Sequence, residues 1–305
     1  MAKKENQTIM SETIVLRNLK LSDNKGITDY IIYTILTLVC FATFYPFWYT
    51  FVISISSIEG YHADMYHIIP NSFDLSSYLY AIKHPDFLNS LFITVSVTVL
   101  GTLLSMFFST MGAYVLSKKQ LIGGGLLFRL IIFTMFFNGG VIPYYILVSK
   151  LGMMNTIFAY FVPVSINTFH LIILKNGFLS NPVSLEESAK IDGCNEITIL
   201  YRIIIPISKP IIATISLFYA VFYWNDFFQP LLFSSGQKTY PLSMFLRSLL
   251  GNISSYSFQA MGNEMLVPEM IKAAFIIISI IPILAVYPFI QTYFVKGVMI
   301  GSIKE

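Results

Sequence analysis

The chain has 305 residues, of which 55% are hydrophobic and only 11% are charged, and its mean hydropathy is +0.70. These values exclude an ordinary soluble globular domain and indicate a membrane protein that crosses the bilayer several times. The net charge of +3 is small and does not suggest that the protein binds nucleic acid.

Apolar stretches long enough to cross a hydrocarbon core of about 30 Å recur along the chain. The N-terminal residues 1–26 are polar and lack the apolar core of a signal peptide, so we expect a cytoplasmic N-terminal segment there. The remainder, 27–305, is predicted to be an all-α membrane domain with six transmembrane helices, at residues 28–55, 88–116, 126–149, 156–179, 207–233 and 271–294. Prolines inside these stretches favour kinked helices that line a cavity; they are Pro46, Pro143, Pro163, Pro282 and Pro288.

Lysine and arginine residues predict the orientation of the helices. If both chain ends, the connection between the second and third spans and the connection between the fourth and fifth spans are cytoplasmic, 14 of the 19 basic residues lie inside. The basic residues left outside are Lys83, Lys150, Lys238, Arg247 and Lys272. We therefore expect the N-terminus, the C-terminus and the 182–206 loop to face the cytoplasm.

Catalytic and metal-binding patterns are missing from the sequence. Cys40 falls in a predicted span and Cys194 in a predicted cytoplasmic loop, so no disulfide framework is expected. The four histidines are scattered without the spacing of metal ligands, and no G-x-x-x-x-G-K-[ST] motif is present. We therefore expect no catalytic residue, no metal site and no cofactor on this chain, and energy for any active process must come from a partner.

The loop between the fourth and fifth predicted spans combines two short predicted helices. Ser184, followed three residues later by Glu187, predicts a capping box that starts the first helix. Gly193 supplies a residue with positive φ to end it, and Asn195 can cap the second helix. Pro206 then closes the second helix before the chain re-enters lipid. The alternative is an amphipathic surface segment that merely covers the end of the helix bundle.

This loop carries the pattern E-[AS]-A-x-x-D-G, followed ten residues after the glycine by I-x-[LI]-P. The pattern resembles the coupling loop of the permease subunits of binding-protein-dependent ABC importers. The matching residues are Glu187, Ser188, Ala189, Asp192, Gly193, Ile203, Ile205 and Pro206. The resemblance implies that Glu187 contacts a groove of the ATPase, that Ala189 permits close packing and that Gly193 holds the bend. Asp192 either contacts the partner or serves only as a helix-end cap.

The resemblance extends over a core permease region at about 85–300. Segments similar to the carbohydrate-uptake branch are Asn89–Leu91, Gly112–Tyr114, Trp224–Asp226 and Pro288–Gly297, and those similar to oligosaccharide permeases are Asn138–Pro143 and Leu151–Thr156. Membership would imply a multi-pass protein of a bacterial cell membrane that imports a carbohydrate, expected to be an oligosaccharide. It would also imply a heterodimer with a second permease, two cytoplasmic ATP-binding subunits that hold ATP and Mg, and an extracellular sugar-binding protein.

Two segments are candidates for the wall of the substrate path: Asn138 with Gly139, and the triplet Trp224, Asn225 and Asp226. A tryptophan face can stack on a sugar ring, and amide and carboxylate groups can bind hydroxyls. A carboxylate at the bilayer centre costs about 2.5–3.5 kcal/mol, so Asp226 is expected to face protein or a water-filled cavity. Its alternative role is structural, either bracing the partner permease or capping a helix end.

Two further alternatives stay open at the level of sequence. The outer connection at 234–270 is long enough to dock a binding protein, but it could also be a linker with an amphipathic helix at 244–250. A secondary, ion-coupled transporter of a small polar solute is the alternative function, although Asp226 is the only clear intramembrane carboxylate and no internal repeat is visible. A neighbouring gene for a second permease would favour the ABC importer.

Overall fold

The computed structural model describes residues 27–63, 66–118, 120–137, 139–251 and 267–302, with the backbone alone for 237, 250–251 and 286–302. Its named elements are all helices, and an isolated β-bridge joins Ser56 to Phe73. The all-α prediction is therefore confirmed for this part of the chain. The predicted N-terminal segment lies outside the described residues.

Three helices in the described part are long and apolar enough to cross a membrane. They are α2 (Ile27–Ser54), α5 (Pro85–Ser117) and the Pro268–Ala285 part of α16 (Pro268–Ser302). Two bent pairs could each form a further span. In one, α6 (Gly124–Phe136) meets α7 (Val141–Lys150) at 109°, and in the other Glu196–Ile207 meets α13 (Lys209–Asn225) at 88°.

Three predicted spans are divided into separate helices, a stronger interruption than the kinks that the prolines predicted. The span 126–149 divides before Gly140, whose φ of 88° is outside the helical range. The span 156–179 divides into α8 (Phe158–Phe161) and α9 (Thr168–Leu179), with Pro163 between them. The span 207–233 divides at Asp226, which is extended between α13 and α14 (Phe228–Phe233).

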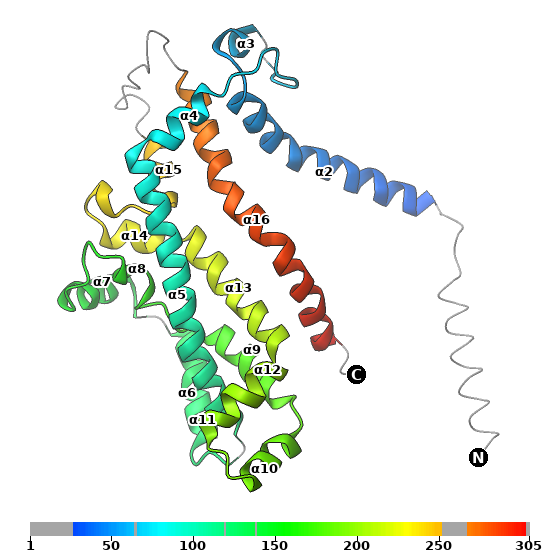
Figure 1. Cartoon of the computed structure of the whole chain (residues 1–305), viewed down its shortest axis with the longest axis vertical. Coiled ribbons are helices and arrows are strands. Elements are labelled where there is room, and N and C mark those ends of the chain that lie inside the picture. The colour runs from blue at the N-terminus through cyan, green and yellow to red at the C-terminus, as the bar shows by residue number, and fades with distance from the viewer. Residues whose placement is uncertain (1–26, 64–65, 119, 138, 252–266, 303–305) are drawn as a thin grey trace.

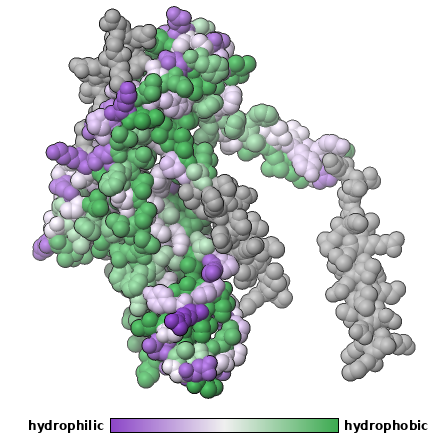
Figure 2. Space-filling view, viewed as in Figure 1, coloured by the Kyte–Doolittle hydropathy of each residue, from purple (hydrophilic) through white to green (hydrophobic). Residues whose placement is uncertain are grey.

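The two ends of the molecule differ in character (Figure 1). One end gathers the short helices α3 (Ile58–Ala63), α4 (Ser76–Lys83) and α15 (Leu242–Gly251). The other end is formed by the hairpin of α10 (Val183–Ile191) and α11 (Glu196–Ile199). α5 runs the whole distance between these ends, and α2 diverges from the bundle. Figure 2 shows hydrophobic side chains over the middle of the bundle and hydrophilic ones gathered on the hairpin.

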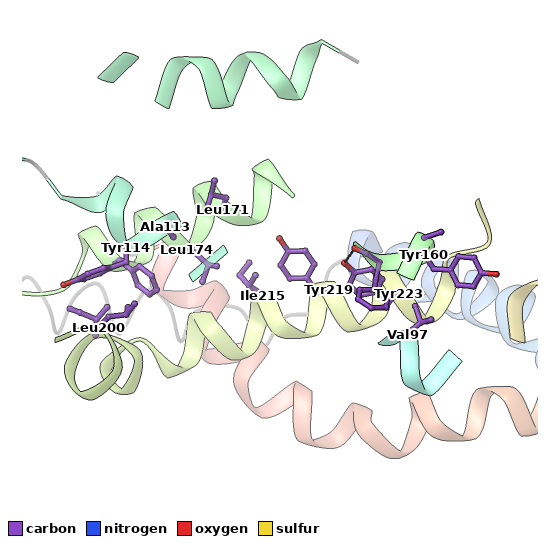
Figure 3. Close-up of a cluster of buried hydrophobic side chains, with 14 of the residues drawn as sticks. Val97, Ala113, Tyr114, Tyr160, Leu171, Leu174, Leu200, Ile215, Tyr219 and Tyr223 are labelled. Carbon is purple, nitrogen blue, oxygen red and sulfur yellow. Dashed lines mark hydrogen bonds between the residues drawn. The ribbon is translucent and has the colours of Figure 1, made fainter. Parts of the chain in front are cut away.

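The main hydrophobic core lies where α5 packs against α13 and α9 (Figure 3). Two hydroxyl pairs cross the α5–α13 contact: Ser105 Oγ lies 2.7 Å from the Tyr223 hydroxyl, and Ser109 Oγ lies 2.8 Å from the Tyr219 hydroxyl. Gly101 sets the distance between the helices, because a Cβ there would lie 2.8 Å from the Tyr223 ring. The small residue and the hydrogen bonds are the usual means by which helices associate in lipid.

A second apolar cluster lies at the end of the molecule that carries α4 and α15. Phe87, in the first turn of α5, packs with Phe245 of α15 and Phe275 of α16, with ring centroids 5.8 and 4.9 Å away. The predicted amphipathic helix at 244–250 is confirmed as α15. Residues 252–266 of the outer connection lie outside the described residues, so its docking role stays a prediction.

We predict that Gly101→Ala destabilises the protein by about 1–3 kcal/mol, the usual cost of inserting a methyl group into a packed core. The added Cβ would lie 3.0 Å or less from both Tyr223 and Phe161. Thermal unfolding of the purified protein in detergent measures the effect. Gly125→Ala is the matched control, because nothing lies within 4 Å of its Cβ. Equal unfolding temperatures for the two variants would contradict the prediction.

Candidate functional site

The first helix of the 182–206 loop begins earlier than the sequence predicted. α10 starts at Val183, and its N-cap residue is Pro182, with φ −61° and ψ 124° and no side-chain cap hydrogen bond. The capping box from Ser184 to Glu187 was therefore wrong, because Ser184 is already inside the helix. Proline fixes φ near the value seen at position 182, so the chain can enter the helix without a capping side chain.

The end of α10 has the geometry of a Schellman motif. The Cys194 N–H donates to the Ala189 carbonyl at 2.9 Å, and the Gly193 N–H donates to the Lys190 carbonyl at 3.0 Å. Gly193 has φ 78°, which confirms the predicted positive φ. The exposed Asp192 is the C-cap residue of this helix. The turn between the two helices of the loop is thus fixed by backbone geometry.

The second helix of the loop, α11, is capped by Asn195 as predicted and is followed by a π-helical turn. Asn195 Oδ1 accepts a hydrogen bond from the Thr198 N–H at 2.8 Å. A π turn, η1 (Leu200–Ile204), follows α11 and leads into α12 (Ile205–Ile207), which contains Pro206. The wider turn accommodates the proline ring, which in a regular α-helix clashes with the carbonyl four residues earlier. The chain bends by 88° immediately afterwards, into α13.

The loop presents different residues inward and outward. Ala189, Ile199 and Leu200 are buried in the main hydrophobic core, so the close packing of Ala189 is with its own chain. Glu187 and Ser188 are exposed. Five large apolar side chains of the loop are also exposed, most of all Ile191, by 87%, and Ile197, by 65%. Exposed apolar side chains together with the exposed carboxylate of Glu187 are suited to binding another protein.

A charged cluster that the sequence did not reveal joins this loop to the end of α5. Lys118 forms ion pairs with Glu186 and, at 3.4 Å, with Glu196. Lys190 pairs with Glu196 at 2.7 Å, and the Tyr114 hydroxyl donates to Glu196 at 2.6 Å. These hydrogen bonds from Lys190 and Tyr114 hold the pKa of Glu196 at about 2. Glu196 therefore stays ionised at neutral pH.

Two cavities flank the break between α6 and α7. One, of about 480 Å³, has Thr134, Asn167, His170 and Tyr219 in its wall. The other, of about 510 Å³, is lined by residues that include Tyr144 and Gln229. Both include Gly139 and Val164, so the predicted path residue Gly139 lies where they meet. Asn138 lies outside the described residues.

The residues of the triplet at 224–226 do not line either of these cavities, although Phe228 and Gln229, which follow closely, line the second one. Trp224 packs against the second apolar cluster, and the Asn225 side chain donates to the Val221 carbonyl at 2.8 Å. Asp226 Oδ1 accepts hydrogen bonds from the Phe228 N–H at 3.0 Å and the Gln229 N–H at 3.5 Å. Asp226 thus caps the start of α14, while its Oδ2 is buried without a partner among the described residues.

Long apolar helices together with broken helices around two cavities are typical of a multi-pass membrane protein. No protein-family model matches the chain. Protein LplC of Bacillus subtilis is 44% identical over 264 residues, 86% of this chain and 90% of LplC. The polygalacturonan/rhamnogalacturonan transport system permease protein YtcP of the same organism is 42% identical over 281 residues, 90% of this chain and 98% of YtcP.

A solved structure agrees with these relatives. A chain of a bacterial ABC transporter involved in the import of the acidic polysaccharide alginate matches with a TM-score of 0.84 and 31% identity, over 90% of this chain and 98% of that chain. The protein therefore belongs to the family of ABC sugar transport system permeases, the membrane subunits of ABC importers. Permease subunits are not themselves enzymes, and membership implies a binding-protein-dependent system with partner subunits.

We predict that Gly193→Val loosens the 182–206 loop, because a β-branched residue at positive φ costs roughly 1–2 kcal/mol or more. Limited proteolysis of the purified protein should then cut within 190–196 faster than in the wild type. Gly193→Asn is the matched control, since asparagine tolerates this conformation and should leave the cleavage rate nearly unchanged. Equal protection of the valine variant would show that the glycine does not determine the turn.

Proposed function

We propose that this chain is one of two homologous permease subunits in a heterodimer that imports a carbohydrate into a bacterial cytoplasm. Two ATP-binding subunits would supply the energy, holding ATP and Mg on their own residues. An extracellular sugar-binding protein would deliver the substrate to the end that carries α3, α4 and α15. The observation that carries the proposal is the rigid hairpin with exposed Glu187 and Ile191 at the opposite end.

The proposed topology has six membrane crossings, with both chain ends in the cytoplasm. Three long helices, the bent pair of α6 and α7, and α13 after the bend that ends the cytoplasmic loop would account for five crossings. The sixth would be formed by α8 and α9, the two helices of the broken segment 156–179. The positive-inside distribution of lysine and arginine supports placing the 182–206 loop in the cytoplasm of a cell-membrane protein.

The proposed coupling site comprises Glu187, Ser188, Ala189, Asp192, Gly193 and Pro206. In this site the exposed Glu187 accepts hydrogen bonds from a basic residue of the ATPase, and the apolar side chain of Ile191 enters its groove. Ala189 instead anchors the helix to its own bundle. Closure of the two ATPase subunits on ATP would draw the two coupling loops together and open the permeases outward.

The proposed substrate path passes the two cavities that meet at Gly139. Their walls offer hydroxyl, amide and imidazole groups, which can bind sugar hydroxyls, together with aromatic rings such as Phe137 and Phe222. Gly139 lines both cavities, whereas the predicted path residues 224–226 line neither. Asp226 is proposed to brace the α13–α14 break, because its carboxylate already caps α14.

The proposed substrate is an oligosaccharide. YtcP is named for polygalacturonan and rhamnogalacturonan transport, and a further relative at 27% identity is the melibiose/raffinose/stachyose import permease protein MelC of Bacillus subtilis. The structural relative belongs to an alginate importer. All of these substrates contain more than one sugar unit, which the joined cavities would suit.

Reconstitution tests the proposed function against the ion-coupled alternative. We expect sugar uptake into liposomes only when this chain is combined with a second permease, the ATPase and a loaded binding protein, and only with ATP. Sugar flux through this chain alone, driven by an ion gradient, would overturn the proposal and support a secondary transporter.

We predict that Glu187→Lys detaches or uncouples the ATPase while membrane insertion is unchanged. Losing one charge-assisted hydrogen bond costs about 1.5–3 kcal/mol, which corresponds to a roughly ten- to one-hundred-fold weaker affinity. Copurification of the ATPase and ATP-dependent uptake measure the effect. Glu59→Lys, in α3 at the opposite end, is the matched charge reversal and should retain copurification of the ATPase. Wild-type copurification and uptake for Glu187→Lys would refute the assigned role.

We predict that Gly139→Phe blocks sugar uptake while the complex still assembles. Nothing lies within 4 Å of a Cβ at Gly139, so the aromatic ring has room to occupy the cavities without displacing the core. Gly125→Phe is the control, because its Cβ also has open space but Gly125 is not in the wall of either cavity. Uptake should fall by at least about ten-fold in the first variant only. Unchanged uptake with normal complex yield would exclude the proposed path.

A further inference from the structure

One helix contacts both ends of the molecule. The first turn of α5 places Phe87 in the apolar cluster with Phe245 and Phe275. Its last turn holds Tyr114, and Lys118 is the C-cap residue. The same helix also forms the main contacts with α13 and α9. We therefore expect a displacement of the C-terminal end of α5, beside the 182–206 loop, to be transmitted along this continuous helix to its N-terminal end at Phe87.

Lys118 is the residue through which α5 holds both helices of the 182–206 loop. Its ammonium group pairs with Glu186 on α10 and with Glu196 at the start of α11, 3.4 Å away. It also lies 3.9 Å from the centre of the Tyr114 ring. The side chains of Lys118 and Glu186 are only 22% and 20% exposed, so water screens their attraction less than that of a surface pair.

Polar contacts hold this side of α10 because close apolar packing is missing there. A cavity of about 480 Å³ separates α10 from the ends of α5 and α9, and Lys118, Glu186 and Glu187 are among the residues that line it. The buried Ala189 is the point at which α10 enters the apolar core. A helix anchored at one small residue can pivot, and the ion pairs of Lys118 restrict that pivot.

We propose that Lys118 is a positioning residue that fixes the 182–206 loop to α5, so that movements of the loop and of α5 are coupled. The inference rests on the proposed function, in which an ATPase grips the loop and a binding protein docks at the far end. Lys118 lines neither cavity of the proposed substrate path. It sets the angle of α10 relative to α5, and thereby links substrate arrival at one end to ATP hydrolysis at the other.

Lys190 provides a matched control within the same charged cluster. It pairs with Glu196 at 2.7 Å and carries the same charge as Lys118. It belongs to α10, however, so its ion pair lies wholly within the loop and makes no bridge to α5. A general loss of charge or of loop stability should affect variants of both lysines, whereas loss of the bridge should affect variants of Lys118 only.

The test uses the complete complex in liposomes and measures ATP hydrolysis with and without sugar-loaded binding protein. We expect Lys118→Met to lower the stimulated-to-basal ratio by roughly five-fold or more, with basal hydrolysis and complex yield unchanged. Lys118→Arg and Lys190→Met should keep the wild-type ratio. The double variant Lys118→Met with Glu186→Gln should have the same stimulated-to-basal ratio as Lys118→Met alone, because the second change removes an ion pair that the first has already removed.

A wild-type ratio for Lys118→Met, or an equal loss for Lys190→Met, would overturn the positioning role while leaving the proposed function intact. If sugar-loaded binding protein does not stimulate ATP hydrolysis by the wild-type complex, the proposed function itself is overturned. If Lys118→Met lowers complex yield, the double variant Glu186→Gln with Glu196→Gln serves instead, since it removes both carboxylate partners of Lys118 and leaves Lys118 in place. A full ratio in that double variant would then refute the bridge.

Discussion

The contact between α5 and α13 is the interaction on which the rest of the structure depends. Gly101 lets the two helices approach until its backbone meets the Tyr223 ring. The hydroxyl pairs of Ser105 and Ser109 add specificity, but hydrogen bonds between membrane helices contribute only about 0.6 kcal/mol each on average. Close packing must therefore supply most of the attraction. The third helix joins by the same means, because a side chain at Gly177 of α9 would overlap Ile211 of α13.

Each break in a helix leaves backbone N–H groups without hydrogen-bond acceptors, and polar residues of the spans supply those acceptors. The first N–H groups of a helix have no partner within that helix, and lipid cannot provide one. Asn167 accepts from the His170 N–H at the start of α9, while the Tyr219 hydroxyl accepts from the Asn167 N–H at 3.0 Å. Asp226 does the same for α14. Several polar residues that could pass for sugar ligands are thus needed first to end and restart helices.

The sequence predicted well those features that depend on local chemistry. The positive φ at Gly193 and the Asn195 cap follow from residue type and neighbouring positions, and both are present. Hydropathy also located the apolar stretches, because lipid exposure acts on every residue of a span. It could not reveal the breaks at Gly140 and Pro163, since a window average is unchanged when a few residues leave the helix. Prolines and glycines in those stretches were the available signal.

Contacts distant in sequence were beyond such reasoning. Lys118 and Glu196 are separated by two whole predicted spans and their connecting loops, and neither belongs to a motif. The structure brings them together because the ends of α5 and α9 lie beside each other, so the loop that follows α9 folds back over the end of α5. This arrangement explains how the hairpin can be both stiff and available. Its inner side is fixed by Ala189, Ile199 and the ion pairs, while its outer side leaves Ile191 uncovered. A loop that transmits displacement needs both properties, because a soft attachment would absorb the movement by bending before it reached α5.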